Sequence, residues 1–294
     1  MILEGMLMRI ETWIKKNTKS LRTRRVAVSG STGGIGMALC HHLASLGADL
    51  ILLDRNPEKS RALADRLVAD YKIDVRCVIA DMTDMASVKA AGEELASLGV
   101  DYLILNAGAY SIPREVLDSG YDNVFQINFV SPYYLARRLL PSVRARGGRI
   151  IAVGSIAHNY SETDPCDVDF KKRRKAGLVY GNAKRYLTFA LQNLSMDDVI
   201  IAHPGISFTG ITNHYPKLIF ALIKHPMKLI FMKPRKASLS ILYALFAHCE
   251  SDCWIGPRLF DVWGMPRVKR LRTAGSEERG RIIKTAEKIY DKIK

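Results

Sequence analysis

The sequence predicts an α/β protein in which one parallel sheet of about seven strands is covered by helices on both faces. Two observations support this fold. Short β-branched or aliphatic runs alternate with amphipathic helical stretches between residues 25 and 203, which is typical of repeated strand–helix–strand units. The runs are also apolar almost throughout, as expected for strands that are buried on both faces of a sheet.

Six apolar runs define the predicted strands in chain order. They are Val26–Val28, Asp49–Leu53, Val75–Ile79, Tyr102–Leu105, Arg149–Val153 and Val199–Ala202. A seventh strand is expected at Arg258–Val262, after a helical stretch at Lys236–Cys249. Because the sequence shows no internal repeat and no Pro/Ser-rich linker, we expect a single domain over residues 25–265.

Two further segments are expected at the ends of this domain. In residues 1–24 the apolar positions recur at intervals of three and four, which predicts an amphipathic helix, and basic residues follow it. This helix either packs against its own subunit or a neighbouring one, or lies on a membrane surface. The apolar positions are Ile2, Leu3, Met6, Leu7, Ile10, Trp13 and Ile14, and the basic ones are Lys15, Lys16, Lys19, Arg22, Arg24 and Arg25. At the other end, residues 266–294 are expected to form a basic helical tail.

A glycine-rich turn follows the first predicted strand and leads directly into a helical stretch. The turn consists of Gly30, Ser31, Thr32, Gly34, Ile35 and Gly36, with Gly33 between them. Gly30 permits a tight turn, Gly34 lets the backbone approach a pyrophosphate, and Gly36 allows the helix to pack closely on the strand. The amino terminus of the helix offers free N–H groups to the phosphate charge. Strand, turn and helix in this order predict a Rossmann-type dinucleotide-binding site.

A carboxylate ends the second predicted strand, 18 residues after Gly36. Asp54 can accept hydrogen bonds from the 2′- and 3′-hydroxyls of a ribose, whereas it would repel a 2′-phosphate. The adjacent Arg55 could pair with that phosphate. The attraction of an exposed arginine for the phosphate is weaker than the repulsion between the carboxylate and the phosphate. Asp54 and Arg55 together therefore favour NAD(H), with NADP(H) as the weaker alternative.

The order of the remaining motifs resembles that of the short-chain dehydrogenase/reductase family, over about residues 25–262. After the glycine turn come Asp81, Asn106-Ala107-Gly108, Asn128, Ser155, Tyr180-xxx-Lys184 and Pro204-Gly205, in the family's order. The resemblance implies a cofactor site that contains these glycine-turn, Asp81 and Asn106–Gly108 residues, together with Met82, Tyr180, Lys184, Pro204, Gly205, Ile206 and Thr209. The catalytic residues that it implies are Asn128, Ser155, Tyr180 and Lys184.

Carbonyl reduction requires these residue types, because a hydride goes to carbon and a proton goes to oxygen. Tyr180 would donate the proton, which requires a pKa about 2–3 units below the reference value of about 10. Lys184 lies one helical turn further on the same face, where its ammonium group favours the phenolate. Ser155 would hold the substrate oxygen. By the resemblance, Asn128 anchors a water that links Lys184 to solvent.

Three positions depart from the usual family pattern but keep the functional group. They are Ser29 in place of the threonine that opens the glycine turn, Leu105 before Asn106, and Gly154 before Ser155. The spacing of 25 residues between the serine and the tyrosine is longer than the commonest one and contains the basic run Lys171–Lys175. This length resembles the hydroxysteroid and retinol dehydrogenase branches, whose substrates are large apolar alcohols and ketones.

Apolar residues after Pro204-Gly205 predict a substrate lid at about residues 206–235. The expected lining residues are Ser155, Phe208, Tyr215, Leu218 and Ile219, with Leu222 nearby. The alternative is that this stretch is ordinary core or a dimer interface. The leading interpretation is an NAD(H)-dependent hydroxysteroid dehydrogenase, and reduction of a steroid side-chain ketone to the 20β-alcohol is the reaction that the resemblance to bacterial members suggests.

Two other functions are open. One is a retinol or other lipid alcohol dehydrogenase at a membrane surface, and the other is a dinucleotide-sensing protein without turnover. The complete set of Ser155, Tyr180 and Lys184 weighs against the sensor. The resemblance implies a homodimer or homotetramer. No metal site is expected, because the histidines and cysteines lack the usual ligand spacing.

Composition excludes several classes of protein. With 48% apolar and 25% charged residues among 294, the chain is globular, and lysines interrupt its longest apolar stretch before it reaches the length of a membrane span. The net charge of +15 (44 basic minus 29 acidic residues) is spread over several segments, which favours solvated surface and steering of an anionic cofactor over nucleic-acid binding. Five cysteines without a CxxC pair predict reduced thiols and a cytoplasmic protein without a secretory signal, and peripheral membrane contact is not favoured.

Overall fold

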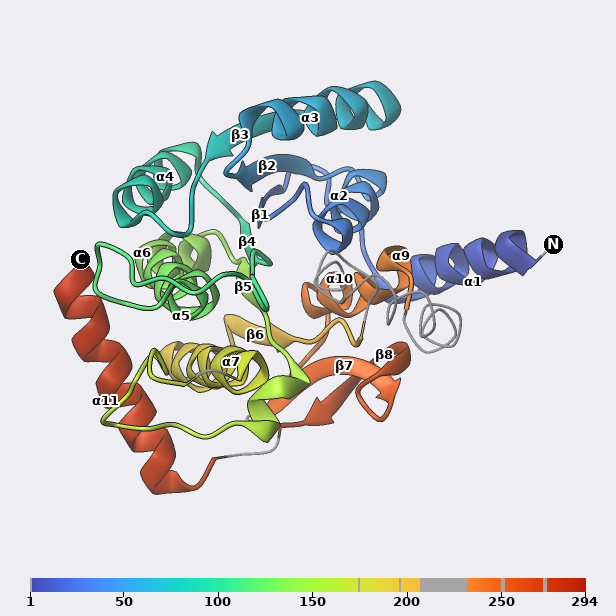
Figure 1. Cartoon of the computed structure of the whole chain (residues 1–294). Helices are drawn as coiled ribbons and strands as arrows, with labels where there is room; N and C mark the ends of the chain where they lie inside the picture. The colour runs from blue at the N-terminus through green and yellow to red at the C-terminus, as the bar shows by residue number, and fades with distance from the viewer. Residues whose placement is uncertain (1, 174, 196, 207–231, 250–251, 272–273) are drawn as a thin grey trace, which may run out of the picture.

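A sheet of eight strands forms the centre of the molecule (Figure 1). The computed structural model describes residues 2–173, 175–195, 197–206, 232–249, 252–271 and 274–294. The strand order is β3-β2-β1-β4-β5-β6-β7-β8, and all neighbours are parallel except β7 and β8, which form an antiparallel hairpin. The strands are β1 (Arg25–Ser29), β2 (Asp49–Asp54), β3 (Val75–Ile79), β4 (Tyr102–Leu105), β5 (Arg149–Val153), β6 (Val199–Ala202), β7 (Cys253–Leu259) and β8 (Trp263–Arg270).

The predicted Rossmann-type fold is confirmed, and β3, β4, β5 and β6 have the predicted bounds. The prediction of a seventh strand at residues 258–262 is wrong, because β7 begins at Cys253 and ends at Leu259. Phe260 and Asp261 have positive φ angles of 50° and 58°, which turn the chain and cannot continue a strand. The sequence also did not reveal β8, because an edge strand that carries Pro266 and several basic residues has no continuous apolar run.

Helices cover both faces of the sheet in two buried layers. On one face lie α4 (Met85–Leu98), α6 (Ser131–Ala145), α7 (Ala176–Leu194) and α11 (Ser276–Ile293). On the other lie α1 (Ile2–Asn17), α2 (Gly34–Ser45), α3 (Pro57–Tyr71) and α10 (Leu239–Ala244). Shorter elements are α5 (Asn123–Phe125), the π-helix η1 (Gln126–Val130), the 3₁₀-helix η2 (Ile156–Tyr160) and α9 (Pro234–Ala237). The helix predicted over residues 236–249 is therefore divided and shorter than expected.

The predicted amino-terminal helix is present as α1, and its second half packs against its own subunit. Ile10 and Ile14 are buried in the same cluster as α2, and the Trp13 ring meets the Tyr243 ring of α10 edge-on at 5.6 Å. Met8 points to solvent, with 67% of its surface exposed. The helix was expected either to pack on a subunit or to lie on a membrane surface. Residues 10–14 pack on their own subunit. Within the described parts of the chain, no helix is long and apolar enough to cross a membrane.

The carboxyl-terminal helix is an integral layer of the core. Ile282, Ala286 and Ile289 of α11 are buried against α6 and α7. An ion pair between Arg185 of α7 and Glu278 of α11 (2.6 Å) adds a second connection. The domain boundary expected at residue 265 falls inside β8 (Trp263–Arg270).

Cys249 and Cys253 form a disulfide, which corrects the prediction of reduced thiols at these two positions. Their Cα atoms are 5.9 Å apart, within the range that a disulfide spans. The sequence did not suggest this pairing, because a spacing of four residues is no recognised motif. Cys40, Cys77 and Cys166 are free.

The packing of α1 predicts a contrast between two of its apolar residues. Ile10→Ala is expected to lower the free energy of unfolding by about 2–5 kcal/mol, because it leaves a cavity in the core. Met8→Ala is expected to change it by less than about 0.5 kcal/mol, because Met8 is exposed. Urea unfolding of both variants measures the difference, and equal effects would mean that α1 does not pack as described.

Candidate functional site

The glycine turn joins the end of β1 to the start of α2. Gly30 has a φ of +65°, and its N–H donates to the carbonyl of Leu53 at the end of β2 (2.9 Å). A Cβ at Gly36 would lie 2.1 Å from the Gly30 carbonyl oxygen, so the turn closes only around a glycine. Gly33 and Gly34 are exposed at the amino terminus of α2, where free N–H groups can receive a phosphate.

The end of β1 is fastened to the end of β4 by the Ser29 hydroxyl. It donates to the carbonyl of Ile104 (3.3 Å) and accepts from the N–H groups of Asn106 (2.9 Å) and Ala107 (3.0 Å). The Asn106 amide in turn donates to the carbonyls of Ser29 (2.9 Å) and Gly30 (3.1 Å). The serine that replaces the family's threonine thus supplies the hydroxyl that sets the turn against Asn106–Gly108.

Asp54 is buried at the end of β2 and contacts the glycine turn directly. One carboxylate oxygen accepts from the Ser31 hydroxyl, and the other accepts from the Thr32 N–H (3.2 Å) and hydroxyl (3.0 Å). The neighbouring Arg55 is exposed. Three neutral donors therefore hold the carboxylate that was expected to face a ribose, and they place it beside the phosphate-binding turn.

The segment after β3 is fixed by side chains of other elements. Asp81 accepts from the N–H and hydroxyl of Thr83 (2.9 and 2.7 Å), and its own N–H donates to the hydroxyl of Ser87 (3.0 Å). The carbonyl of Met82 accepts from the hydroxyl of Ser131 at the start of α6 (2.7 Å). Asp81 and Met82 therefore lie at the same edge of the sheet as the glycine turn.

Ser155, Tyr180 and Lys184 come together where β5 ends and α7 begins. Ser155 precedes η2, and its hydroxyl accepts from the N–H of Ala157 (3.2 Å) and forms a hydrogen bond with Tyr180. Lys184 is buried, and its ammonium group donates to the carbonyl of Val153 (2.8 Å) and lies 5.7 Å from the centre of the Tyr180 ring. The main chain at the end of β5 thus fixes both the serine and the lysine.

Asn128 lies in the π-helix η1, and its amide donates to the carbonyls of Ala109 and Val124 (2.8 Å each). Its side-chain oxygen is buried and has no hydrogen-bond partner among the described residues. A Cβ at Gly108 would lie 2.8 Å from this oxygen and 3.7 Å from the Lys184 nitrogen. Asn128, Gly108 and Lys184 are therefore neighbours, and the free acceptor faces the lysine side of the site. Single π-turns of this kind occur often at functional sites.

The pKa values of Tyr180 and Lys184 differ from those expected from the sequence. Burial raises the pKa of Tyr180 to about 12, although its hydrogen bond with Ser155 acts in the opposite direction. Burial also lowers the pKa of Lys184 to about 7. The expectation that Lys184 brings the pKa of Tyr180 below 10 is thus wrong for the chain alone. The physical reason is that removal from water disfavours both the phenolate and the ammonium ion.

Two residues near this site were missed by sequence reasoning. The Tyr110 ring packs edge-on against the Tyr180 ring, with 5.2 Å between centroids. His158 is fully buried, and its Nδ1 donates to the carbonyl of Ser155 (2.5 Å). Burial lowers the pKa of His158, which keeps its ring neutral. His158 lies three residues after Ser155, but nothing in the sequence distinguishes it or Tyr110 as part of the site.

The segment after β6 lies against the β7–β8 hairpin. Gly205 has a φ of +80°, and a Cβ there would lie 2.6 Å from the carbonyl oxygen of Val262. The N–H of Ile206 donates to the same carbonyl (3.3 Å). Pro204, Gly205 and Ile206 thus follow β6 at the carboxyl edge of the sheet. The other predicted residues, Phe208, Thr209, Tyr215, Leu218, Ile219 and Leu222, lie outside the described residues.

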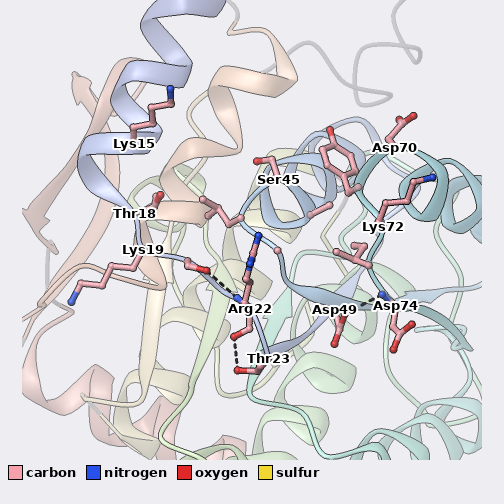
Figure 2. Close-up of a pocket in the computed structure, with 16 residues that line it drawn as sticks. Lys15, Thr18, Lys19, Arg22, Thr23, Ser45, Asp49, Asp70, Lys72 and Asp74 are labelled. Atoms are coloured by element: carbon pink, nitrogen blue, oxygen red, sulfur yellow. Dashed lines mark hydrogen bonds between the residues drawn. The ribbon is translucent and has the colours of Figure 1, made fainter.

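A cavity of about 900 Å³ opens at the opposite edge of the sheet, where β1, β2 and β3 begin (Figure 2). Its lining mixes lysines and arginine with aspartates, and the labelled residues include Lys15, Lys19, Arg22, Asp49, Lys72 and Asp74. None of the predicted catalytic or cofactor residues lines it. Because ligands of open α/β sheets bind at the carboxyl ends of the strands, we assign the candidate site to the Gly30–Tyr180 edge.

A glycine turn, a helix amino terminus and a partly buried tyrosine beside a buried lysine at the carboxyl edge of a parallel sheet define the class, which is a Rossmann-type α/β protein. Residues 24–164, just under half of the chain, match the family model described as short chain dehydrogenase. The match covers the glycine turn, Asn106 and Ser155. Tyr180 and Lys184 lie beyond it.

Among similar proteins is the polyprenol dehydrogenase of Mus musculus, which is 27% identical over 240 residues, 76% of this chain and 72% of the mouse protein. The chain spans between 42% and 57% of the length of three further curated relatives that are 30% to 32% identical to it.

Solved structures share the fold. A crystal structure of an uncharacterized protein from Mycobacterium paratuberculosis has a TM-score of 0.71 and 22% identity, and the match covers 95% of this chain and 94% of that one. L-Sorbose reductase from Gluconobacter frateurii, complexed with NADPH and L-sorbose, has a TM-score of 0.62 and 21% identity, with 79% and 92% covered.

The low pKa of Lys184 predicts a pH-dependent effect on stability. A folded pKa of about 7, below the ordinary value of 10.5, means that the unfolded chain binds more protons between these values. Stability from this group is therefore lost at low pH and rises as pH increases from about 7 to about 10. Wild-type protein should gain about 4 kcal/mol between about pH 6 and about pH 10 relative to Lys184→Met. Urea unfolding of both proteins at the two pH values measures this gain, and parallel pH profiles would show that Lys184 titrates normally.

Proposed function

We propose that the chain is an NAD(H)-dependent oxidoreductase that interconverts a ketone and a secondary alcohol on a hydrophobic substrate. The observation that carries this proposal is the cluster of Ser155, Tyr180 and Lys184 at the carboxyl edge of the sheet. The glycine turn at the same edge supplies the phosphate-binding part of a cofactor site. These parts are the ones that carbonyl reduction needs.

In this proposal Tyr180 donates its proton to the substrate oxygen, and Ser155 orients that oxygen by a hydrogen bond. The bound nicotinamide supplies the hydride. With a pKa of about 12, Tyr180 holds its proton throughout the neutral range, as a donor for reduction must. Charged Lys184 stabilises the phenolate that remains, and a group with a pKa of about 7 can also lose and regain a proton near neutrality.

Asn128 would complete the return of the proton. Its unpartnered, buried side-chain oxygen lies beside Gly108 and close to Lys184. An acceptor at this place suits a bridge between Lys184 and solvent, because a buried polar atom is costly when it has no partner. The role is that of a positioning residue, since Asn128 would act through Lys184.

We propose NAD(H) as the preferred cofactor, with NADP(H) as the alternative. Asp54 is buried next to the glycine turn, and among the described residues it forms no ion pair that would offset its charge. A 2′-phosphate would meet this carboxylate, whereas a ribose diol could donate to it. The L-sorbose reductase that shares the fold was crystallised with NADPH, so the residues of this chain, and not the fold, support the preference.

The substrate class is proposed in two forms. The first is a steroid, which rests on the resemblance of the Ser155–Tyr180 spacing to the hydroxysteroid branch. An NADH-dependent 20β-hydroxysteroid dehydrogenase is the single best assignment, because Asp54 and the added amino-terminal helix resemble the bacterial members of that branch. The second is a long-chain lipid alcohol, which the similarity to polyprenol dehydrogenase favours. A screen of NADH oxidation with steroid, retinoid and polyprenyl carbonyl compounds separates the two, and no oxidation with any of them would favour a dinucleotide sensor.

A homodimer or homotetramer is proposed from the family resemblance.

The catalytic proposal predicts that Tyr180→Phe lowers kcat by about 10²–10⁴-fold, because the proton donor is lost. Binding of NADH, measured by fluorescence titration, should change little, because the ring remains. Tyr160→Phe is the matched control, since this tyrosine is 73% exposed and should keep wild-type turnover. Near-wild-type turnover of Tyr180→Phe would show that another group donates the proton.

The cofactor proposal predicts that Asp54→Asn lowers the ratio of kcat/KM with NADH to kcat/KM with NADPH by about tenfold or more, because the repulsive charge is removed. Asp65→Asn, at an exposed position on α3, should leave the ratio unchanged. An unchanged ratio in Asp54→Asn would mean that Asp54 supports the glycine turn without selecting the cofactor.

A further inference from the structure

The tip of the β7–β8 hairpin exposes an unusual concentration of apolar surface. Eight large apolar side chains are exposed in the described part of the chain, and three of them lie within residues 259–263. They are Leu259 (46% exposed), Phe260 (91%) and Trp263 (43%), and we call residues 259–263 the hairpin tip. Apolar clusters of this kind on a protein surface usually mark a contact with a partner or a membrane.

Folding alone does not explain a phenylalanine at this position. Phe260 occupies the turn with a φ of 50°, a region that a bulky side chain adopts only at a cost. Glycine or asparagine would fit this turn without strain, and neither would lose buried surface, because the Phe260 side chain is almost fully exposed. A residue that is unfavourable for both the turn and the solvent points to a role outside the fold.

Positive charge surrounds the hairpin tip. Arg258 precedes it and is exposed, and the ammonium group of Lys236 in α9 lies 3.4 Å from the centre of the Trp263 ring. The nearby Asp261 carboxylate is paired with Lys269 (2.7 Å), so it does not offset these charges.

The hairpin tip is also connected to the segment that follows β6. The imidazole of His203 donates from Nε2 to the carbonyl of Asp261 (2.8 Å), and the N–H of Ile206 donates to the carbonyl of Val262 (3.3 Å). These bonds join the tip to Pro204-Gly205, at the edge of the sheet that carries the candidate site. Figure 1 shows the hairpin on the same side as α9.

We propose that the hairpin tip docks on an anionic membrane surface, with Phe260 and Trp263 in the interfacial layer and Arg258 and Lys236 against the lipid headgroups. Aromatic side chains flanked by lysine and arginine are the combination that such an interface binds. A second copy of the chain fits this surface less well. Two tips facing each other would bring like charges together, and three side chains cover far less area than a stable dimer needs.

This inference goes beyond the proposed reaction and concerns residues outside the catalytic cluster. It differs from the earlier alternative of α1 as a membrane helix, because Ile10 and Ile14 of α1 are buried in the core. Docking at the hairpin tip would hold the edge of the sheet that carries the candidate site close to the lipid phase, from which an apolar substrate could enter.

Co-sedimentation of the full chain with vesicles tests the proposal without measuring turnover. Vesicles of equimolar phosphatidylcholine and phosphatidylserine should bind the wild-type protein about tenfold more tightly than phosphatidylcholine alone, and added salt should weaken the binding. Phe260→Ser should lower the affinity for the anionic vesicles about tenfold, because it removes the most exposed apolar side chain.

Val116→Ser is the matched control, because Val116 is 60% exposed and lies in the segment between β4 and α5, outside the β7–β8 hairpin. It should bind like the wild type, and thermal melting should show that both variants are folded. The proposal is overturned if the wild-type chain does not bind anionic vesicles, or if Phe260→Ser binds as well as Val116→Ser. It is also overturned if Phe260→Ser changes only the oligomeric state in sedimentation velocity, which would assign the tip to a second copy of the chain.

Discussion

The buried hydroxyl of Ser29 is the constraint on which the candidate site depends. It bonds three backbone groups of the β4 end, and Asn106 returns two bonds to the β1 end. These bonds hold two parallel strand ends in one arrangement, which in turn fixes the positive φ of Gly30 and the position of the α2 amino terminus. The bond from Lys184 to Val153 does the same for α7 and β5. Hydrogen bonds between buried side chains and the main chain, and not surface ion pairs, therefore hold the glycine turn and α7 at the carboxyl edge of the sheet.

The same burial that gives the site its geometry also opposes its charged states. The pKa of Tyr180 rises to about 12 and that of Lys184 falls to about 7, so both groups favour their neutral forms in the chain alone. Ionisable groups with shifted pKa values are typical of active sites, where residues needed for activity often lower the stability of the fold. Burial also favours the neutral form of His158. Its ring donates one hydrogen bond to the Ser155 carbonyl and so holds the serine backbone without adding a charge.

Sequence patterns predicted the parallel part of the fold because buried strands and glycine turns leave clear signals. The bounds of β3 to β6 were correct. The β7–β8 hairpin was misplaced, since a polar edge strand and a turn made by Phe260 resemble neither a buried strand nor a usual turn. Contacts between distant residues left no signal, and these include the Tyr110–Tyr180 ring pair and the Cys249–Cys253 disulfide. In the chain alone the pKa of Tyr180 is raised and not lowered, because the proximity of Lys184 can be seen in the sequence but the effect of burial cannot.

We propose that the dinucleotide binds at the carboxyl edge of the sheet, between the glycine turn and Tyr180. A crystal structure of the full chain with NADH tests this placement. We expect the pyrophosphate at the amino terminus of α2, next to Gly33 and Gly34, and the nicotinamide within reach of the Tyr180 hydroxyl. Density for the dinucleotide in the cavity lined by Lys15, Arg22 and Asp74 at the opposite edge would show that the cofactor binds elsewhere.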